Sequence, residues 1–346
     1  MINVGINGLG RIGKSLLRIV SESSDDEINI IAIKDFNSFS VSDEEYLNNI
    51  AYLMQNDSIY GQFPYKIKTE KNHIIFNDRK IPVFLDRNIQ TVNWNELGCD
   101  VIVEASGTIN NIKYVKDTFG DKLKKAIITR GIKEADFTFV KGVNDKEFDS
   151  KNHHVISAST CTGNAFAPFA KFIDSFYGIE NGSVCTIHPV LSSEKMIDGF
   201  NKSFQLGRAG KSVKLIPTAI ANSTIDVLPH LKDRIMINSL SYRIPTDIVS
   251  SIYGVLILKN KVTTNKLIQD LESEIGKNLN GVIELCEGSF GHSKVSIDFL
   301  KNKHSAIIDK NWIQMNDNLL QFHLWHDNEY GYTMRVFDII KKINLG

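Results

Sequence analysis

Short apolar runs separated by amphipathic or polar segments fill the first half of the chain. A run at 2–7 is followed by a glycine turn and by a segment at 11–20 whose apolar residues recur at helical spacing. Further strand-like runs lie at 28–35, 74–76, 81–84, 100–104, 125–129, 137–140 and 154–157. Strands that alternate with helical or turn segments predict an α/β doubly wound fold for this half.

The pattern changes in the second half, where long β-rich runs replace the alternation. A helix is expected near 167–176, and a strand and turn at 322–332 precede a closing helix at 333–343. The β-rich runs between them lie at 183–188, 235–243 and 252–258. These runs predict a second domain that begins near Cys161.

The glycines that follow the first strand fit the pattern G-x-G-x-x-G between a strand and a helix. Gly8 allows the tight turn, Gly10 lets the backbone approach a pyrophosphate, and Gly13 permits close packing of helix on strand. The N-terminus of the following helix then receives the phosphate charge. We expect a dinucleotide site here.

An acidic residue, Asp35, ends the second strand about twenty residues beyond the last glycine, where a ribose diol is bound in such folds. A carboxylate at this position repels a 2′-phosphate, which favours NAD over NADP. Two alternatives remain open. Asp35 is also suited to capping the next segment, and the neighbouring Lys34 is a residue that tolerates a 2′-phosphate.

Cys161 lies among hydroxyl and amide side chains in the segment 156–168, at an expected turn from strand to helix. Helix N-termini carry partial positive charge and free N–H groups, so a cysteine there loses its proton near neutral pH and attacks a carbonyl. The alternative is a buried structural cysteine. We interpret the other cysteines as structural: Cys99, Cys185 and Cys286.

A nucleophilic cysteine needs a base, and His188 is the best candidate among nine histidines. It ends a β-branched strand before Pro189, and strand ends often project into clefts. An imidazole with a pKa near neutrality takes the thiol proton and then serves the oxygen of a carbonyl adduct. The alternative is an ordinary partnered histidine.

Composition adds loose bounds. The 346 residues, 42% of them hydrophobic, predict two domains, 1–160 and 161–329, with the segment 330–346 packing back on the first. Lysine plus arginine equals aspartate plus glutamate at 40 each, which argues against a nucleic-acid or anionic membrane partner. No C-x-x-C spacing, signal peptide or long apolar run is present, so we expect no metal site and a cytoplasmic setting.

Three motifs in order carry a family resemblance: N-G-L-G-R-I-G at 7–13, C-T-x-N at 161–164 and W-H-D-N-E-Y-G-Y at 325–332. With these motifs the chain resembles glyceraldehyde-3-phosphate dehydrogenase over nearly its full length. The resemblance implies a Rossmann domain that binds NAD, and an α+β catalytic domain with a mostly antiparallel sheet. It also implies a homotetramer that assembles through the sheet of the second domain.

The resemblance implies a role for each matching residue. Cys161 attacks an aldehyde to form a thiohemiacetal, His188 acts as base during hydride transfer to NAD, and inorganic phosphate releases the resulting acyl thioester. Cofactor contacts fall on Arg11 and Ile12 near the pyrophosphate and on Asn328 at the nicotinamide carboxamide. The phosphate-binding positions that match are Thr160, Thr162, Arg208 and Arg243.

The sequence departs from the family at the anion-binding positions. Leu191 replaces a threonine that helps to bind the substrate phosphate, and leucine donates no hydrogen bond. The family's threonine-threonine-glycine turn corresponds to Thr218-Ala-Ile-Ala, with Asn222-Ser223-Thr224 just beyond. Ile248 falls where asparagine is common, and Arg130 lies in a replaced serine-alanine-proline segment.

Three functional hypotheses follow. The first is NAD-dependent phosphorylating oxidation of glyceraldehyde 3-phosphate, with inorganic phosphate as the second substrate. The second is the same covalent chemistry on another sugar aldehyde such as erythrose 4-phosphate, with water as a further candidate acceptor. The third is a catalytically weak paralogue retained for binding or regulation, against which the intact Cys161 and His188 argue.

Overall fold

The chain forms two compact units. The computed structural model describes residues 1–23, 27–234, 239–290 and 292–343. The first unit contains Met1–Phe139, Glu147–Ser159 and Thr333–Gly346, and the second contains Val140–Lys146 and Thr160–Tyr332. The short segment 140–146, which the sequence assigned to the first domain, belongs to the second unit because Val140 and Val143 join its core.

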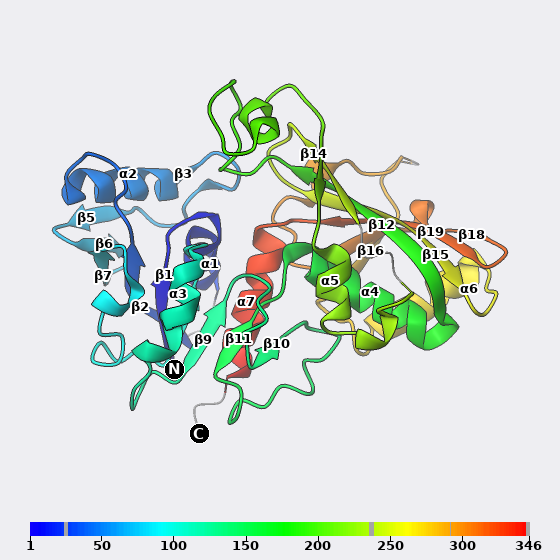
Figure 1. Ribbon diagram of the computed structural model, residues 1–346, viewed down its shortest axis with the longest axis horizontal. Coiled ribbons are helices and arrows are strands. Elements are labelled where there is room, and N and C mark those ends of the chain that lie inside the picture. The colour runs from blue at the N-terminus through cyan, green and yellow to red at the C-terminus, as the bar shows by residue number, and fades with distance from the viewer. Residues whose placement is uncertain (24–26, 235–238, 291, 344–346) are drawn as a thin grey trace. The chain divides into compact units, whose positions relative to one another are not determined.

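A mostly parallel sheet organises the first unit. Within the described residues it has nine strands in the order β10-β11-β9-β8-β1-β2-β7-β6-β5 (Figure 1). The strands are β1 (Ile2–Asn7), β2 (Ile28–Asp35), β5 (Lys68–Glu70), β6 (His73–Phe76), β7 (Arg79–Leu85), β8 (Val101–Glu104), β9 (Lys125–Ile128), β10 (Phe137–Thr138) and β11 (Val155–Ser157). The small pair β3 (Asn56–Asp57) and β4 (Gly61–Gln62) lies apart from it.

Buried strands and amphipathic helices explain this sheet. β8 and β9 are buried at every position, as strands covered on both faces are. α1 places Leu16, Leu17 and Val20 in the interior. The helices of this unit are α1 (Arg11–Glu22), α2 (Asp43–Gln55), α3 (Ile109–Tyr114) and the part of α7 (Tyr330–Lys342) that begins at Thr333. The predicted α/β doubly wound fold is confirmed.

A mostly antiparallel sheet organises the second unit. In the part of the chain that the structure describes, the sheet runs β13-β14-β12-β15-β19-β17-β16, and β18 pairs with β19. The strands are β12 (Ile179–Pro189), β13 (Lys214–Pro217), β14 (Leu240–Ile244), β15 (Ser250–Leu258), β16 (Ile283–Cys286), β17 (Ala306–Asp309), β18 (Gln314–Asn316) and β19 (Leu319–His326). Its helices are α4 (Cys161–Tyr177), α5 (Ile220–Ile225) and α6 (Thr264–Ile275).

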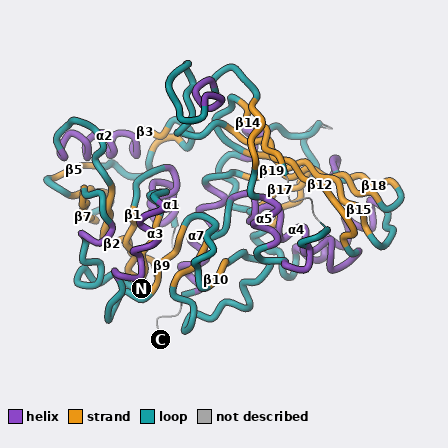
Figure 2. The backbone as a smooth tube through the Cα atoms, in the orientation of Figure 1, coloured by secondary structure: helices purple, strands orange, loops and turns teal. Residues whose placement is uncertain are grey.

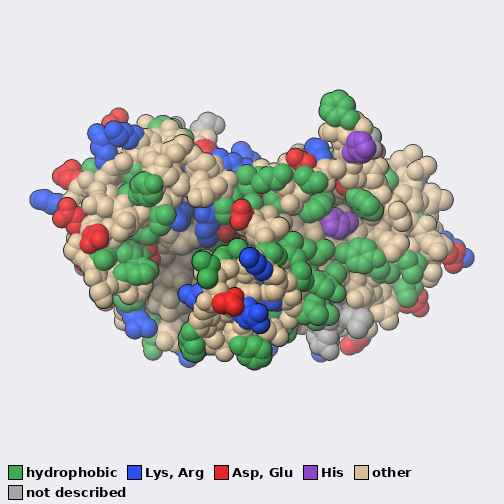
Figure 3. Space-filling model, turned by 90° about the horizontal axis from the view of Figure 1, so that it is seen from above, with side chains coloured by type: hydrophobic (Ala, Val, Ile, Leu, Met, Phe, Trp, Pro, Cys, Tyr) green, Lys and Arg blue, Asp and Glu red, His purple; other side chains and the backbone are tan. Residues whose placement is uncertain are grey.

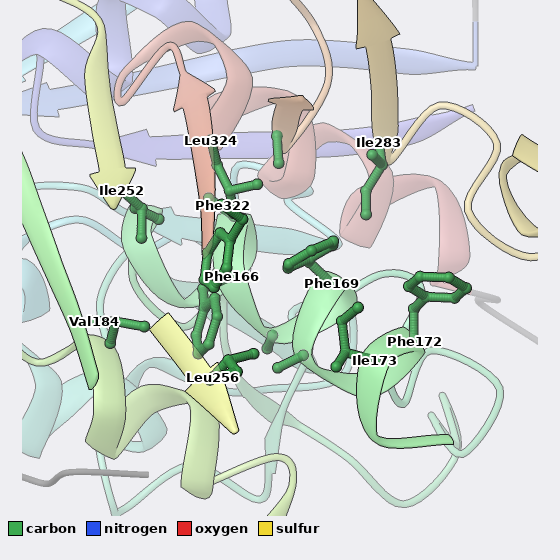
Figure 4. Close-up of a cluster of buried hydrophobic side chains, with 14 of the residues drawn as sticks. Phe166, Phe169, Phe172, Ile173, Val184, Ile252, Leu256, Ile283, Phe322 and Leu324 are labelled. Atoms are coloured by element: carbon green, nitrogen blue, oxygen red, sulfur yellow. The ribbon is translucent and has the colours of Figure 1, made fainter. Parts of the chain in front are cut away.

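The core of the second unit lies between α4 and the sheet. α4 packs against β12, β15 and β19 (Figure 2). Phe166 of α4 stacks on Phe322 of β19 with ring centroids 5.9 Å apart, and Phe169 contacts the same ring at 4.9 Å (Figure 4). Burial of these large rings fixes the height of α4 over the sheet and therefore the position of its first turn.

Three predicted elements differ from the structure. The helix expected near 167–176 begins at Cys161, because Thr160 caps it and Pro168 is accommodated inside it. The run at 235–243 yields a strand only from Leu240, and residues 235–238 lie outside the described residues. The run at 137–140 forms the two-residue strand β10.

Gly254 offers a sharp test of core packing. It pairs with Phe322 across β15 and β19, and a Cβ at this position would lie 2.2 Å from the Phe322 ring. We expect Gly254→Ala to lower the free energy of unfolding by about 1–3 kcal/mol, because the ring has to leave its packed position. Urea denaturation followed by circular dichroism measures this loss.

Gly276 supplies the matched control. It ends α6 with φ −63°, and the nearest atoms to a Cβ there lie at ordinary contact distance, the closest at 3.6 Å. Gly276→Ala is expected to leave stability unchanged or raise it by up to about 1 kcal/mol. Equal losses in the two variants would contradict the packing argument.

Candidate active site

Cys161 is the first residue of α4. The side chain of Thr160 caps this helix by accepting a hydrogen bond from the Gly163 N–H at 2.9 Å. Backbone N–H groups of Cys161 and Thr162 point at the sulfur. The thiol therefore lies at the positive end of a long helix, among donors that stabilise a developing negative charge.

The thiol is nevertheless held protonated in this structure. Burial raises the pKa of Cys161 to about 11, and the Thr162 N–H and the charge of Arg243 only partly oppose that rise. Burial therefore opposes the ionisation near neutral pH that the helix N-terminus favours. Desolvation of the thiolate outweighs the helix dipole, so the reaction requires a base.

His188 ends β12 and is suited to be that base. Its Nδ1 lies 2.8 Å from the carbonyl oxygen of Pro189, and a carbonyl only accepts, so Nδ1 carries the proton and Nε2 the free electron pair. Burial, together with the charge of Arg243, lowers the pKa of His188 to about 4. The imidazole is thus neutral at pH 7, with a pKa below the near-neutral value expected from the sequence. It takes the thiol proton only as the sulfur bonds to the aldehyde carbon.

Arg243 of β14 links the two reactive groups. Its charge acts on both Cys161 and His188, and its Nη1 donates to the Pro189 carbonyl at 3.1 Å. The guanidinium is buried, with 7% of the residue exposed. The structure therefore brings together the nucleophile, the base and one predicted phosphate-binding arginine.

Three hydroxyl groups gather at the capped end of α4. Thr160 Oγ1 lies 3.3 Å from Thr162 Oγ1 and donates to Ser223 Oγ at 3.0 Å. Ser223, on α5, is the residue that sequence reasoning did not select, although it stands just beyond the altered Thr218 turn. Its only signal in the sequence was a hydroxyl side chain close to that turn, and the packing of α5 on α4 brings this hydroxyl to Thr160.

Arg208 does not join this cluster. It ends the short 3₁₀ helix Phe204–Arg208, its side chain is 77% exposed, and Nε lies 3.5 Å from Asp198 Oδ2. Leu191 is also exposed, whereas Ile248 is buried. The predicted role of Arg208 in phosphate binding has no support from this geometry, because the side chain is exposed and directed to Asp198.

The glycine turn of the first unit meets the steric demands of a dinucleotide site. Gly8 has φ +106°, and a Cβ on it would lie 2.6 Å from the Ser106 backbone. A Cβ on Gly13 would lie 2.0 Å from the Gly8 carbonyl oxygen, so only glycine lets α1 approach this turn. At Gly10 no atom stands within 4 Å of the Cβ position, which leaves room for a ligand.

The side chains around this turn are arranged for an uncharged ribose. The side chain of Arg11 is engaged by Asp57, with Nη1 2.7 Å from Oδ2. What Arg11 and Ile12 offer to a ligand is therefore their backbone N–H groups at the start of α1. Asp35 ends β2 and accepts a hydrogen bond from Tyr46 at 3.0 Å. Lys34 is buried and donates to the Asp86 carbonyl at 2.5 Å, so it does not offer its charge to a 2′-phosphate.

Asn328, in the second unit, carries an unsatisfied acceptor. The residue is 7% exposed, and its Oδ1 has no hydrogen-bond partner among the residues that the structure describes. A buried amide oxygen without a partner is costly, and a ligand amide would satisfy it. These observations fit the role of holding a carboxamide.

The described residues form neither a cluster of metal ligands nor a membrane-spanning helix. Outside the masked positions, no three histidine, cysteine, aspartate or glutamate side chains are grouped as metal ligands. No described helix has the length and apolar character to cross a membrane. All four cysteines lie in the described ranges and are free thiols.

Comparison with known proteins matches both units. The chain fits the family models described as glyceraldehyde 3-phosphate dehydrogenase, NAD binding domain, over residues 2–112, and glyceraldehyde 3-phosphate dehydrogenase, C-terminal domain, over residues 160–328. It is 33% identical over 344 residues to glyceraldehyde-3-phosphate dehydrogenase 2 of Bacillus subtilis, covering 99% of this chain and 96% of that one. It is 34% identical over 345 residues to glyceraldehyde-3-phosphate dehydrogenase of Ogataea parapolymorpha, covering 99% and 98%.

Proposed function

Because the chain belongs to the glyceraldehyde-3-phosphate dehydrogenase family, we propose that it oxidises glyceraldehyde 3-phosphate and transfers the acyl group to inorganic phosphate. It is an NAD-dependent oxidoreductase of that family. The observation that carries the proposal is the grouping of Cys161 and His188 around Arg243, which supplies a nucleophile, a base and a buried positive charge for a phosphorylated aldehyde.

The first half of the reaction uses Cys161 and His188. His188 Nε2 takes the thiol proton as the sulfur attacks the aldehyde carbon, and the backbone N–H groups at the start of α4 stabilise the oxygen on which charge develops. His188 returns this proton to the oxygen, which gives the neutral thiohemiacetal, and takes it back from the hydroxyl as the thiohemiacetal is oxidised. Bound NAD supplies the hydride acceptor. Cys161 is left holding the acyl group as a thioester.

The second half needs an acceptor for the acyl group. A phosphate oxygen attacks the thioester carbonyl, the carbon–sulfur bond breaks, and the acyl phosphate leaves as Cys161 regains its proton. The hydroxyls of Thr160, Thr162 and Ser223 stand next to the nucleophile. They donate to a phosphate placed there when Thr160 and Ser223 rotate their protons away from their present acceptors, Ser223 Oγ and the Ala219 carbonyl. The buried Arg243 balances the charge of the substrate's own phosphate.

A second candidate function rests on the anion-binding side chains. Leu191 has no donor, and Arg208 points to Asp198 with 77% of its side chain exposed. Fewer phosphate donors favour the same covalent chemistry on another sugar aldehyde such as erythrose 4-phosphate, or release of the acyl group by water. Each missing hydrogen bond to a charged group costs about 1.5–3 kcal/mol.

The deciding experiment measures NADH formation by the purified protein with glyceraldehyde 3-phosphate, with and without inorganic phosphate. We expect fast turnover that depends on phosphate, because the hydroxyl cluster and Arg243 provide both anion sites. Turnover without phosphate would transfer the acceptor role to water. Turnover only with erythrose 4-phosphate would establish the second candidate, and NADH formation with neither aldehyde would favour a binding or regulatory paralogue.

We also propose a homotetramer assembled through the sheet of the second unit. The edge strand β13 and its neighbour β14 carry exposed apolar side chains, and Leu215 pairs with Tyr242 while Leu240 pairs with Cys185 of β12. Hydrophobic side chains gather on the surface of the protein seen in Figure 3. Large exposed apolar patches favour association. Sedimentation equilibrium tests this, and a monomer at micromolar concentration would contradict it.

A further inference from the structure

A row of basic side chains crosses the sheet at the active site. Lys214 of β13 pairs with Arg243 of β14, and Arg243 pairs with His188 of β12. Side chains at paired positions lie on the same face of a sheet, next to one another. All three residues are buried, with 6%, 7% and 7% of their surface exposed in that order. The like charges of Lys214 and Arg243, set side by side in this way, destabilise a sheet unless a counter-charge lies between them.

Glu194 supplies that counter-charge. It belongs to the segment that follows β12, and 2% of its side chain is exposed. Its Oε2 lies 2.9 Å from Lys214 Nζ, and its Oε1 lies 3.1 Å from Arg243 Nε. One carboxylate thus bridges two buried cations on neighbouring strands. A buried bridge of this kind holds its members in one arrangement, because any displacement leaves a charge unpaired.

The network continues from Arg243 to the catalytic base. Arg243 Nη1 and His188 Nδ1 meet at the same acceptor, the carbonyl oxygen of Pro189, at 3.1 Å and 2.8 Å. The Nδ1 contact sets the tautomer of His188 and leaves Nε2 free. Movement of the guanidinium therefore changes both the charge beside His188 and the donors that share the Pro189 carbonyl.

We propose that Glu194, held by Lys214, is a positioning residue that fixes Arg243 for the substrate phosphate and keeps His188 in the tautomer the reaction needs. This inference rests on the proposed function for the identity of the substrate. Its structural part, the tautomer of His188, does not depend on that identity. Glu194 touches neither substrate nor reacting atoms and acts through Arg243.

Variants that remove charge show whether Glu194 positions Arg243 or only neutralises the two buried cations. Glu194→Gln keeps the shape of the side chain but leaves two buried cations unpaired, so it is expected to lower both stability and activity. Lys214→Gln keeps the Glu194–Arg243 pair but removes the cation that holds Glu194, so it is expected to lower activity less than Glu194→Gln does. The double variant Glu194→Gln, Lys214→Gln removes equal and opposite charges and is expected to fold normally, while Arg243 still lacks its carboxylate.

The experiment compares these three variants with the unaltered protein in two measurements. Steady-state kinetics are expected to show kcat/KM for glyceraldehyde 3-phosphate lowered at least about tenfold in the double variant, mainly through KM. Nitrogen-15 NMR of the imidazoles, with the His188 signals assigned from His188→Gln, is expected to show a protonated Nδ1 in the unaltered protein and mixed tautomers in the double variant. The acid limb of the rate profile shifts as well, since the charge of Arg243 on β14 lowers the pKa of His188. The other titratable group beside His188 is His326 on β19, which burial keeps neutral.

The double variant decides the matter. If it folds with full kcat/KM and an unchanged His188 tautomer, Glu194 only compensates charge and the proposal is overturned. If the unaltered protein does not oxidise glyceraldehyde 3-phosphate, the proposed function fails, and the NMR comparison still tests the role of Glu194. Glu70→Gln, which breaks an exposed pair with Lys80 at 3.0 Å, is the matched control and is expected to change neither measurement.

Discussion

The Cys161→Ser protein is expected to form NADH at least about 10⁴ times more slowly than the unaltered protein. A serine hydroxyl at the same place keeps the N–H groups of α4 and the base, but it is a far weaker acid than a thiol and gives an ester in place of a thioester. The loss falls on kcat, because the residue forms the covalent intermediate. NADH absorbance under saturating aldehyde and NAD measures it.

Two controls make this result specific. Cys185 lies on β12, is half-buried, and has a pKa raised by burial, so Cys185→Ser is expected to retain full activity. Calorimetry is expected to show that Cys161→Ser binds NAD with unchanged affinity, because the glycine turn belongs to the first unit. Residual turnover within tenfold of the unaltered protein would exclude Cys161 as the nucleophile.

The sequence alone predicted the features that depend on residues close together in the chain. Gly8 and Gly13 were predicted from their spacing, and the structure places a backbone atom within 2.6 Å of each missing Cβ. Cys161 was placed at a turn from strand to helix by the residues around it, and α4 begins there. Such features are set by a few neighbouring residues, so a single sequence contains them.

Features that depend on register between distant strands were not predictable. Glu194 and Lys214 lie in different segments and meet only because β13, β14 and β12 align Lys214, Arg243 and His188 in one row. Ser223 likewise gained its place from the packing of α5 on α4.

The errors have a related cause. The sequence gives no measure of burial at a single atom, so the rise in the pKa of Cys161 was missed. Arg208 matched by position, but its segment turns outward to Asp198. A motif therefore identifies the nucleophile more securely than it identifies the residues that surround a ligand, because those residues come from long loops whose course is set by tertiary packing.

The His188→Gln protein is expected to lose about 10²–10⁴-fold in kcat, since it removes the group that takes the proton from Cys161 and then from the adduct. Burial holds the pKa of His188 at about 4, below the ordinary 6.5, so the unaltered imidazole is neutral throughout the neutral range. Titration of His188 therefore leaves the rate of NADH formation by the unaltered protein constant near neutral pH, and lowers it only as the pH approaches about 4.

The variant should show the opposite dependence on pH. Without a base the reaction relies on the thiolate already present, and with the pKa of Cys161 at about 11 that fraction grows about tenfold for each pH unit below it. Residual NADH formation should therefore climb steadily from neutral to alkaline pH. His323→Gln is the control. His326 is the histidine of β19 that lies near His188, and His323, three residues earlier on the same strand, points to the other face of the sheet. A variant whose rate remained level with pH would mean that Cys161 ionises without His188, and the base would have to be sought elsewhere.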